Sequence, residues 1–268
     1  SFDSEAVNFT HRNVFNTDQP VVGGGRFNVS SGVSLSFDWI GVYVTPKVKL
    51  QATGYSLHDQ SEANAPNNIT RLVPVFSVDS GATFSRDINF FQRSYNQTLE
   101  PRLFYLFVPA KNQDNIPLFD TNLPALDFDQ LFRDNRFGGI DRIGDANQIA
   151  VALTTRLLDD YGQEKLNASL GQVLVMHKHQ VIIDNGTTDP LVNEAVSPLI
   201  GKMHYSITPK ITAAAGMAWD ANYNHFNTAN VSLGYNDGGD KVVNFWYNYS
   251  LLDRDSSLRK VGASLGWR

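Results

Sequence analysis

The chain has 268 residues, a formal net charge of −5 and no cysteine. Because only 18% of its residues are charged and the balance is acidic, it lacks the basic surface that nucleic-acid binding requires, and no nucleic-acid partner is expected. No run of about 18 apolar residues predicts a transmembrane helix, and the lack of cysteine excludes disulfides within these residues. Aromatic residues reach 12% and Asn, Ser, Thr and Gly are abundant, which favours β structure.

The first strongly periodic segments lie in the N-terminal part of the chain. Residues 33–37 (VSLSF) alternate apolar and serine residues, and residues 42–53 (VYVTPKVKLQAT) alternate over about six two-residue repeats. Such a strand is longer than most soluble strands and approaches the roughly 9 to 11 residues that cross a bilayer as a tilted strand. Residues 148–157 repeat the alternation, with Ile149 and Val151 on one face.

The C-terminal third reads as a meander of similar strands. Residues 211–223 (ITAAAGMAWDANY) place apolar side chains such as Met217 and Trp219 at odd positions and small or polar ones at even positions. Three more segments follow this scheme: residues 229–237, 242–252 and 258–267. Turns such as residues 208–210 and 237–240 separate the segments, as hairpins require. The whole chain is therefore predicted to have about a dozen strands and no convincing amphipathic helix.

The connections between these strands are unequal in length. Some have about two to five residues, whereas residues 110–145 and 179–198 are long and polar. Alternating short and long connections are typical of a transmembrane barrel, which has tight turns on one side of the membrane and long loops on the other. No linker or change of composition divides the chain, so residues 1–268 are predicted to form a single domain.

The composition of the second face decides between a membrane barrel and a soluble sandwich, jelly roll or propeller. A soluble sheet usually carries Lys, Glu and Arg outside, whereas here the face opposite the apolar one carries residues such as Asn230, Ser232, Gly234 and Ser264. Such residues suit a water-lined lumen. The apolar face is therefore predicted to contact lipid, which leaves no core in the usual sense. Open sheet edges cannot persist in hydrocarbon, so the strands must close alone or with further strands.

One stretch carries a specific resemblance. The blocks are TLEPR (98–102), YLFVP (105–109), LFRDNRFGGIDRIGDANQ (131–148) and TTRLLDD (154–160). They resemble the C-terminal barrel region of the LptD family, outer-membrane proteins of lipopolysaccharide assembly. The resemblance implies that residues 1–268 are a partial outer-membrane β-barrel domain, about half of a barrel of roughly 26 antiparallel transmembrane strands, without the family's periplasmic jelly-roll domain. The family's paired cysteines would lie outside this stretch.

The resemblance also implies a function and partners. Proteins of this family insert lipopolysaccharide into the outer leaflet of the Gram-negative outer membrane, in contact with membrane lipid. They work with the lipoprotein LptE, which plugs the lumen, and receive lipopolysaccharide from a periplasmic bridge through the N-terminal domain. No cofactor and no enzymatic activity are implied. The alternative is a general porin or a ligand-gated outer-membrane receptor, which would need a complete closed set of strands in this chain.

Three charged residues on predicted strands are candidates for the lumen. Glu100 and Arg102 share a face opposite Leu99 and Leu103, and Arg156 lies on the lumen side of its own strand. Charges on the lipid face are costly, so these side chains are expected to point inward. There they would act either as structural ion pairs that fix strand register or as direct contacts to the substrate.

The long loop holds the remaining candidates. Its charged residues alternate in sign: Arg133, Asp134, Arg136, Asp141 and Arg142. The loop is predicted to fold inward as a lid over the lumen or to contact the plug protein, and the alternative is that its arginines bind sugar phosphates. No catalytic residues and no metal site are predicted, because His177 and His179 share a face without a third ligand and are expected at a solvated strand end.

Overall fold

The computed structural model describes residues 1–10, 22–60, 65–90, 93–183, 194–239, 241–253 and 256–267. Over these residues the chain forms fourteen β-strands in one sheet and a short 3-10 helix, η1. The elements are β1 (Phe2–Phe9), β2 (Gly23–Ser34), β3 (Phe37–Trp39), β4 (Val42–His58), β5 (Asn68–Ala82), β6 (Phe84–Phe90), β7 (Arg93–Val108), η1 (Asp129–Phe132), β8 (Ala146–Asp159), β9 (Glu164–Val175), β10 (Leu199–Thr208), β11 (Ile211–Asp220), β12 (His225–Asn236), β13 (Lys241–Asp253) and β14 (Ser256–Trp267). The predicted all-β, antiparallel class is confirmed. No helix in the described part is long and apolar enough to cross a membrane.

The sheet is a meander in which each strand pairs with its neighbours in sequence. Its hydrogen-bonded order is β1-β2-β4-β5-β7-β8-β9-β10-β11-β12-β13-β14, while β3 and β6 lie beside this path. β3 pairs with β4, as β2 does, and β6 pairs with β7, as β5 does, so β2–β3 and β5–β6 are interrupted single strands. The chain thus contributes twelve positions to the sheet, in agreement with the predicted number of about a dozen.

Long and short connections alternate from β7 to β11, as predicted. Residues 109–145 join β7 to β8 and residues 176–198 join β9 to β10, both at the same end of the sheet. At the opposite end, residues 160–163 join β8 to β9 and residues 209–210 join β10 to β11. This asymmetry is the one that transmembrane barrels show between their two sides.

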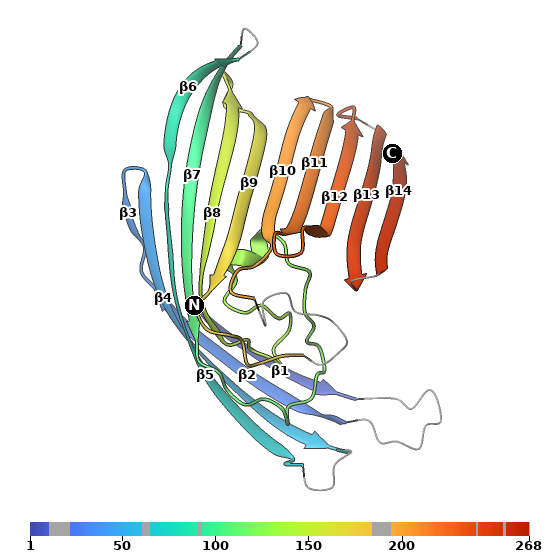
Figure 1. The fold of residues 1–268 in the computed structure, drawn as a ribbon. Helices are drawn as coiled ribbons and strands as arrows, with labels where there is room; N and C mark the ends of the chain where they lie inside the picture. Colours follow the sequence, from blue (N-terminus) through green and yellow to red (C-terminus); the bar gives the residue numbers. More distant parts are fainter. Residues whose placement is uncertain are drawn as a thin grey trace.

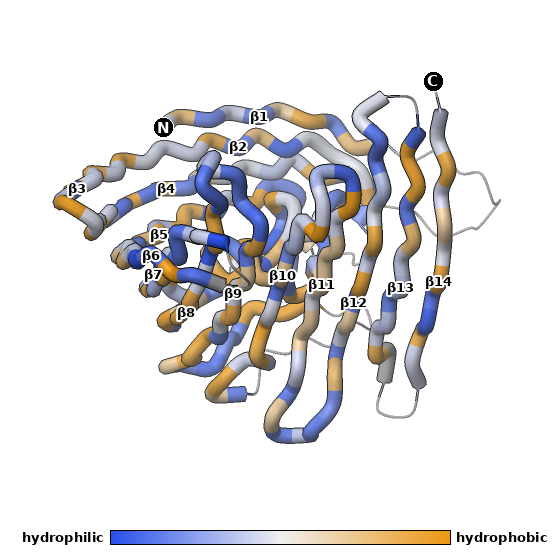
Figure 2. Tube along the Cα trace, turned by 90° about the horizontal axis from the view of Figure 1, so that it is seen from above, coloured by the Kyte–Doolittle hydropathy of each residue, from blue (hydrophilic) through white to orange (hydrophobic). Residues whose placement is uncertain are grey.

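The sheet curves into an open trough, with β1 and β14 at its two edges (Figures 1 and 2). Among the described residues these edge strands pair only with β2 and β13, so the sheet is not closed. The convex face exposes apolar side chains on every part of the sheet, including Val48, Leu153, Val231 and Leu265. An apolar band of this kind is the surface that a membrane-spanning sheet presents to lipid.

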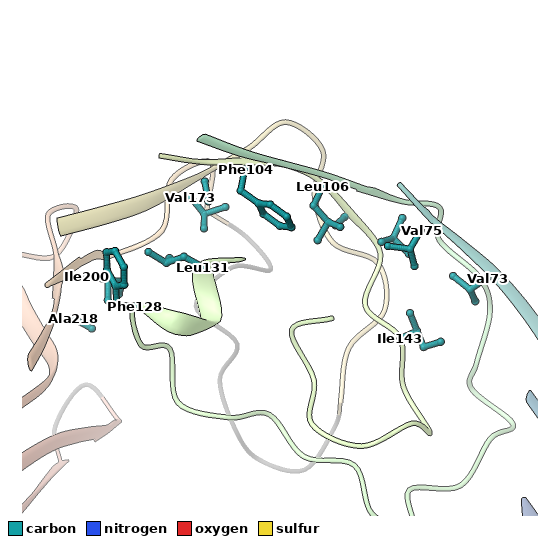
Figure 3. Close-up of a cluster of buried hydrophobic side chains, with 13 residues drawn as sticks. Val73, Val75, Phe104, Leu106, Phe128, Leu131, Ile143, Val173, Ile200 and Ala218 are labelled. Atoms are coloured by element: carbon teal, nitrogen blue, oxygen red, sulfur yellow. The ribbon is translucent and has the colours of Figure 1, made fainter. Parts of the chain in front are cut away.

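The concave face contains a hydrophobic core, and the expectation that the chain has none is wrong. Residues 109–145 fold back into the trough (Figure 1), where Phe128, Leu131 and Ile143 pack against the sheet. Figure 3 shows Ile143 near Val73 of β5, and Phe128 and Leu131 near Ile200 of β10 at the other end of the cluster. The error has a physical cause, because two-residue alternation identifies one lipid-facing side but does not reveal a loop that covers the other side.

Residues 71–76 (RLVPVF) and 103–108 (LFYLFV) contain a local signal that a loop covers the inner face of these strands. Val73 and Leu106 point inward while Leu72 and Phe107 point outward, so both faces of these strands carry apolar side chains. Strands that are buried on both faces have nearly continuous apolar sequences. Such runs are absent from β12 and β14, whose concave faces the loop does not cover.

Candidate functional site

The candidate site is the concave face together with residues 109–145, called the inner loop below. The loop contains every charged candidate between Arg133 and Arg142, and it lies inside the curve of the sheet in Figure 1. Two groups of polar contacts hold it, one against β1 to β5 and one against the chain that follows β9. The first group is the larger and centres on Asp141.

Asp141 is fully buried, with 0% of its surface exposed. Its Oδ1 accepts hydrogen bonds from Arg26 Nη1 at 2.7 Å and from the hydroxyl of Tyr55 at 3.1 Å. Its Oδ2 accepts the backbone N–H groups of Phe119 and Asp120 at 2.8 and 3.0 Å. A buried carboxylate is stable only when cations and donors compensate the lost hydration, and Asp141 has both. The side chain therefore anchors the loop to β2 and β4.

Arg26 joins the edge of the sheet to the inner loop. Besides Asp141 it binds Glu5 of β1 and Asp120 of the loop, each at 2.6 Å. The hydrogen bond from Arg26 lowers the pKa of the Asp120 carboxyl below its ordinary value. One guanidinium thus links β1, β2 and two points of the loop, because its planar fork can donate in several directions at once.

Arg71 of β5 binds the loop through its backbone. Its guanidinium donates to the carbonyls of Ile140 and Asp141 at 2.6 and 2.7 Å. It also donates to the Gln113 side chain at 2.7 Å, and Gln113 in turn donates to the carbonyl of Ile143 at 2.8 Å. These bonds satisfy carbonyls that a buried loop would otherwise leave without partners.

Sequence reasoning missed Arg26, Arg71 and Tyr55. A partial signal was present, because Arg26 is the one charged residue of β2 and Arg71 stands directly before the apolar residues Leu72 and Val73 of β5. Since a buried charge requires a partner, each of these arginines predicts that an acidic or carbonyl-rich segment packs against its side chain.

The second group of contacts ties the loop to the chain after β9. The Asp145 carboxylate accepts the backbone N–H groups of Gln180 and Val181 at 2.8 and 2.9 Å. Arg136 donates to the carbonyl of Asp145 at 2.8 Å and to that of Val181. The two long connections of the sheet therefore fold against each other.

His179 takes part in the same contact. It is 6% exposed, and its Nδ1 lies 2.6 Å from the carbonyl of Asp145. The expectation of a solvated position is wrong for His179, because the segment after β9 turns inward against the inner loop. His177 is exposed, in line with that expectation.

The other loop candidates have different surroundings. Asp134 forms an ion pair with Lys47 of β4 at 2.5 Å. Arg142 is buried, donates to the carbonyl of Asp141 at 3.2 Å, and has a pKa below the ordinary value because burial disfavours its charged form. Arg133 is the one exposed residue among the five loop candidates.

Glu100, Arg102 and Arg156 all lie on the concave side, but in two separate pairs. Arg102 donates from Nε to Asp79 at 2.9 Å, and its guanidinium lies 3.8 Å above the ring of Phe132 in η1. Arg156 binds Glu100 at 3.1 Å and Glu164 at 2.8 Å. Glu100 and Arg102 thus pair with neighbouring strands, since residues two apart on one strand are farther from each other than from cross-strand neighbours.

Comparison with known proteins gives one consistent match. The model of the family described as LptD, LPS transport system D, matches residues 1–268. The LPS-assembly protein LptD of Coxiella burnetii (strain RSA 493 / Nine Mile phase I) is 39% identical over 243 residues, which cover 90% of this chain and 27% of that protein. The LPS-assembly protein LptD of Azoarcus sp. (strain BH72) is 37% identical over 274 residues, which cover 100% of this chain and 32% of that protein. The chain spans about a third or less of the length of these relatives.

Solved structures add little to this match. Outer membrane phospholipase A from Escherichia coli superposes with a TM-score of 0.34 and 13% identity, over 92% of this chain and 79% of that one. The likeness is too slight to bear on activity.

Proposed function

The chain belongs to the LptD family, and we propose on this basis that it forms part of an outer-membrane translocon that assembles lipopolysaccharide into the outer leaflet of a Gram-negative outer membrane. The observation that carries the proposal is the family match over the whole chain. The architecture supports it, because a sheet with an apolar convex face and small polar residues on the open part of its concave face separates lipid from a polar passage. The role is transport, without covalent chemistry.

We also propose the partners that the family resemblance implies. The lipoprotein LptE would occupy the trough, and a periplasmic bridge would deliver lipopolysaccharide through an N-terminal domain of the longer protein. In this arrangement Arg26, Arg71 and Asp141 hold the inner loop in place as a scaffold. Arg133, the one exposed residue among the five loop candidates, is the best placed of them to contact a plug or a passing substrate.

The porin or receptor alternative is not favoured. The family match covers all 268 residues and leaves no segment that suggests a different barrel.

Photocrosslinking in cells tests the proposed function. The full-length protein would carry a photoreactive residue at Arg156, on the concave face of β8, or at Leu153, on the convex face of the same strand. We expect the concave probe to crosslink to newly made lipopolysaccharide only while delivery from the periplasm continues. The convex probe should report resident membrane lipid whether or not delivery is blocked. If arrest of delivery changed neither signal, or both equally, the proposal would be wrong.

A photoreactive residue at Arg133 tests the partner. Crosslinks from this position to a small lipoprotein would support the plug role. Crosslinks to lipopolysaccharide alone would instead place the loop on the transport route and contradict the plug contact.

A further inference from the structure

A cavity of about 420 Å³ lies between η1 and the concave face of β10–β12. It is separate from the Asp141 anchor and is not used by any contact described above. Its polar lining comes from the loop and from three strands: Asp127, Asp129, Asn167, Lys202, His204 and Asn230. Cavities of this size accommodate small ligands when a few polar groups converge in them.

The cavity exists because the inward face of β11 is made of very small residues. Ala214 and Gly216 form its floor, opposite the loop. At Gly216 a Cβ atom would lie 2.8 Å from the side chain of Asn230. The amide of Asn230 therefore lies directly over the glycine, close to the backbone of β11. The small residues at the even positions of residues 211–223 therefore leave space between β11 and the loop that passes over it.

The lining favours an uncharged, hydroxyl-rich ligand over an anion. Asp127 and Asp129 carry two negative charges against one positive charge on Lys202. Asn167 and Asn230 each offer amide donors and acceptors, which match sugar hydroxyls in both directions. Lys202 binds Asp129 at 2.8 Å, but the Asp129 side chain is 77% exposed, so this pair is weak and can exchange for ligand hydroxyls.

One aromatic side chain lies on the same concave wall, outside the cavity. Trp246 of β13 pairs in register with Ser232 of β12, two residues from Asn230, and with Gly262 of β14. A Cβ atom at Gly262 would lie 2.1 Å from the indole, so the ring lies against the wall over this glycine. The indole is still 37% exposed and therefore presents one side to the trough. An aromatic surface suits the apolar face of a sugar ring, so Trp246 offers a second contact to an oligosaccharide that extends from the cavity along the wall.

We propose that the cavity under η1 is a subsite for uncharged sugar units of an oligosaccharide, and that the exposed side of Trp246 contacts a further unit of the same oligosaccharide. The inference rests on the proposed function, since lipopolysaccharide is the molecule that would bring a saccharide into the trough. It assigns a role to residues that are otherwise unexplained: the small floor of β11, the amides of Asn167 and Asn230, and an inward-facing Trp.

A binding experiment tests the subsite with the full-length protein and its natural partners in detergent. The probes are the lipid-free core oligosaccharide of lipopolysaccharide, the same oligosaccharide after enzymatic removal of its phosphates, and inorganic phosphate. We expect the two oligosaccharides to bind with similar affinity and inorganic phosphate not to compete. Affinity that disappeared with the phosphates would contradict an uncharged-sugar site.

Matched variants locate the binding. Ala214→Leu fills the cavity floor and should weaken oligosaccharide binding at least tenfold, whereas Ala213→Leu adds the same atoms on the convex face of β11 and should leave the affinity unchanged. Trp246→Ala should weaken binding several-fold, and Trp267→Ala, on the convex face of β14, should not. Equal affinity for Ala214→Leu and Ala213→Leu, with both variants folded by heat-modifiable migration, would overturn the proposal.

A photoreactive residue at His204 in cells separates this proposal from the proposed function. Delivery-dependent crosslinks to lipopolysaccharide from His204 as well as from Arg156 support both. Crosslinks from Arg156 but only polypeptide crosslinks from His204 would assign the cavity to a protein partner and overturn the subsite alone. Loss of delivery-dependent crosslinks from both positions would overturn the proposed function, while oligosaccharide binding that is sensitive to Ala214→Leu would still support the subsite.

Discussion

The two halves of the concave face differ although the same sheet forms both. From β4 to β9 the inner loop covers much of the face, which carries the apolar core together with buried polar side chains such as Arg71, Thr53 and Ser77. From β10 to β14 most of the face is open and carries Gly, Ala, Ser and Asn. The strands differ as well, because β4, β5 and β7 have 17, 15 and 16 residues, whereas β10 to β14 have 10 to 13.

The difference shows that the cover over a strand, rather than its alternation, sets the chemistry of its inward face. The convex faces of both halves follow one rule, since Leu153 in β8 and Leu233 in β12 are equally exposed apolar residues. On the concave side, the loop requires apolar partners and compensated charges beneath it. Where no loop lies, small polar residues keep the trough wide and hydrated. Substitutions should therefore be most costly under the loop and mild in the open half.

The largest effect is expected for Asp141→Asn. The change removes a buried charge that compensates Arg26 and receives the N–H groups of the loop, and loss of one partner of a buried ion pair costs on the order of 3 kcal/mol. Urea unfolding of the full-length protein in lipid vesicles would measure the loss. Limited proteolysis should cut the inner loop faster. Asp114→Asn, an exposed change in the same loop, is the control, and equal effects of the two would refute the anchor role.

Leu131→Ala should cause the next largest loss of unfolding free energy. Leu131 is 1% exposed and lies between η1 and the sheet, so its truncation leaves a cavity and costs about 2 to 4 kcal/mol. The same unfolding assay applies, with Leu118→Ala as the control, because Leu118 is an exposed leucine of the same loop. A change of unfolding free energy as small as that of the control would mean that the loop is not packed against the sheet.

Gly262→Ala probes the open half and should have a moderate effect. The new methyl group would displace the Trp246 indole, and overpacking of this kind costs about 1 to 2 kcal/mol. Near-ultraviolet circular dichroism would report the ring movement. At Gly266, on the same face of β14, a Cβ atom meets nothing within 4 Å, so Gly266→Ala should leave the spectrum unchanged. Identical spectra for both variants would contradict the position of the ring.

The smallest effect is expected for Arg156→Gln. Its side chain is 41% exposed, and its partners Glu100 and Glu164 are also partly exposed. Solvent screens such pairs, which contribute about 0.2 to 1 kcal/mol. The difference between this variant and the unchanged protein should shrink further in 1 M salt, where the screening length falls to about 3 Å. A loss as large as that of Asp141→Asn would show that Arg156 belongs to a tightly coupled site.

The sequence alone determined the strands, their number, the lipid-facing side and the alternation of long and short connections. These features are local, because period-two patterning and turn residues act over a few neighbouring positions. The resemblance blocks also marked residues 131–148 as a specific segment, and strand parity predicted that Glu100, Arg102 and Arg156 face inward.

Only the tertiary structure decided what lies inside the trough. Arg26 and Asp141 are 115 residues apart in sequence, and no local pattern encodes their contact. Likewise, Trp246 lies over Gly262 because β13 and β14 pair in one register, and the cavity under η1 arises where the loop crosses the small face of β11. Such contacts depend on the path of the chain through space, which periodicity along one strand does not contain.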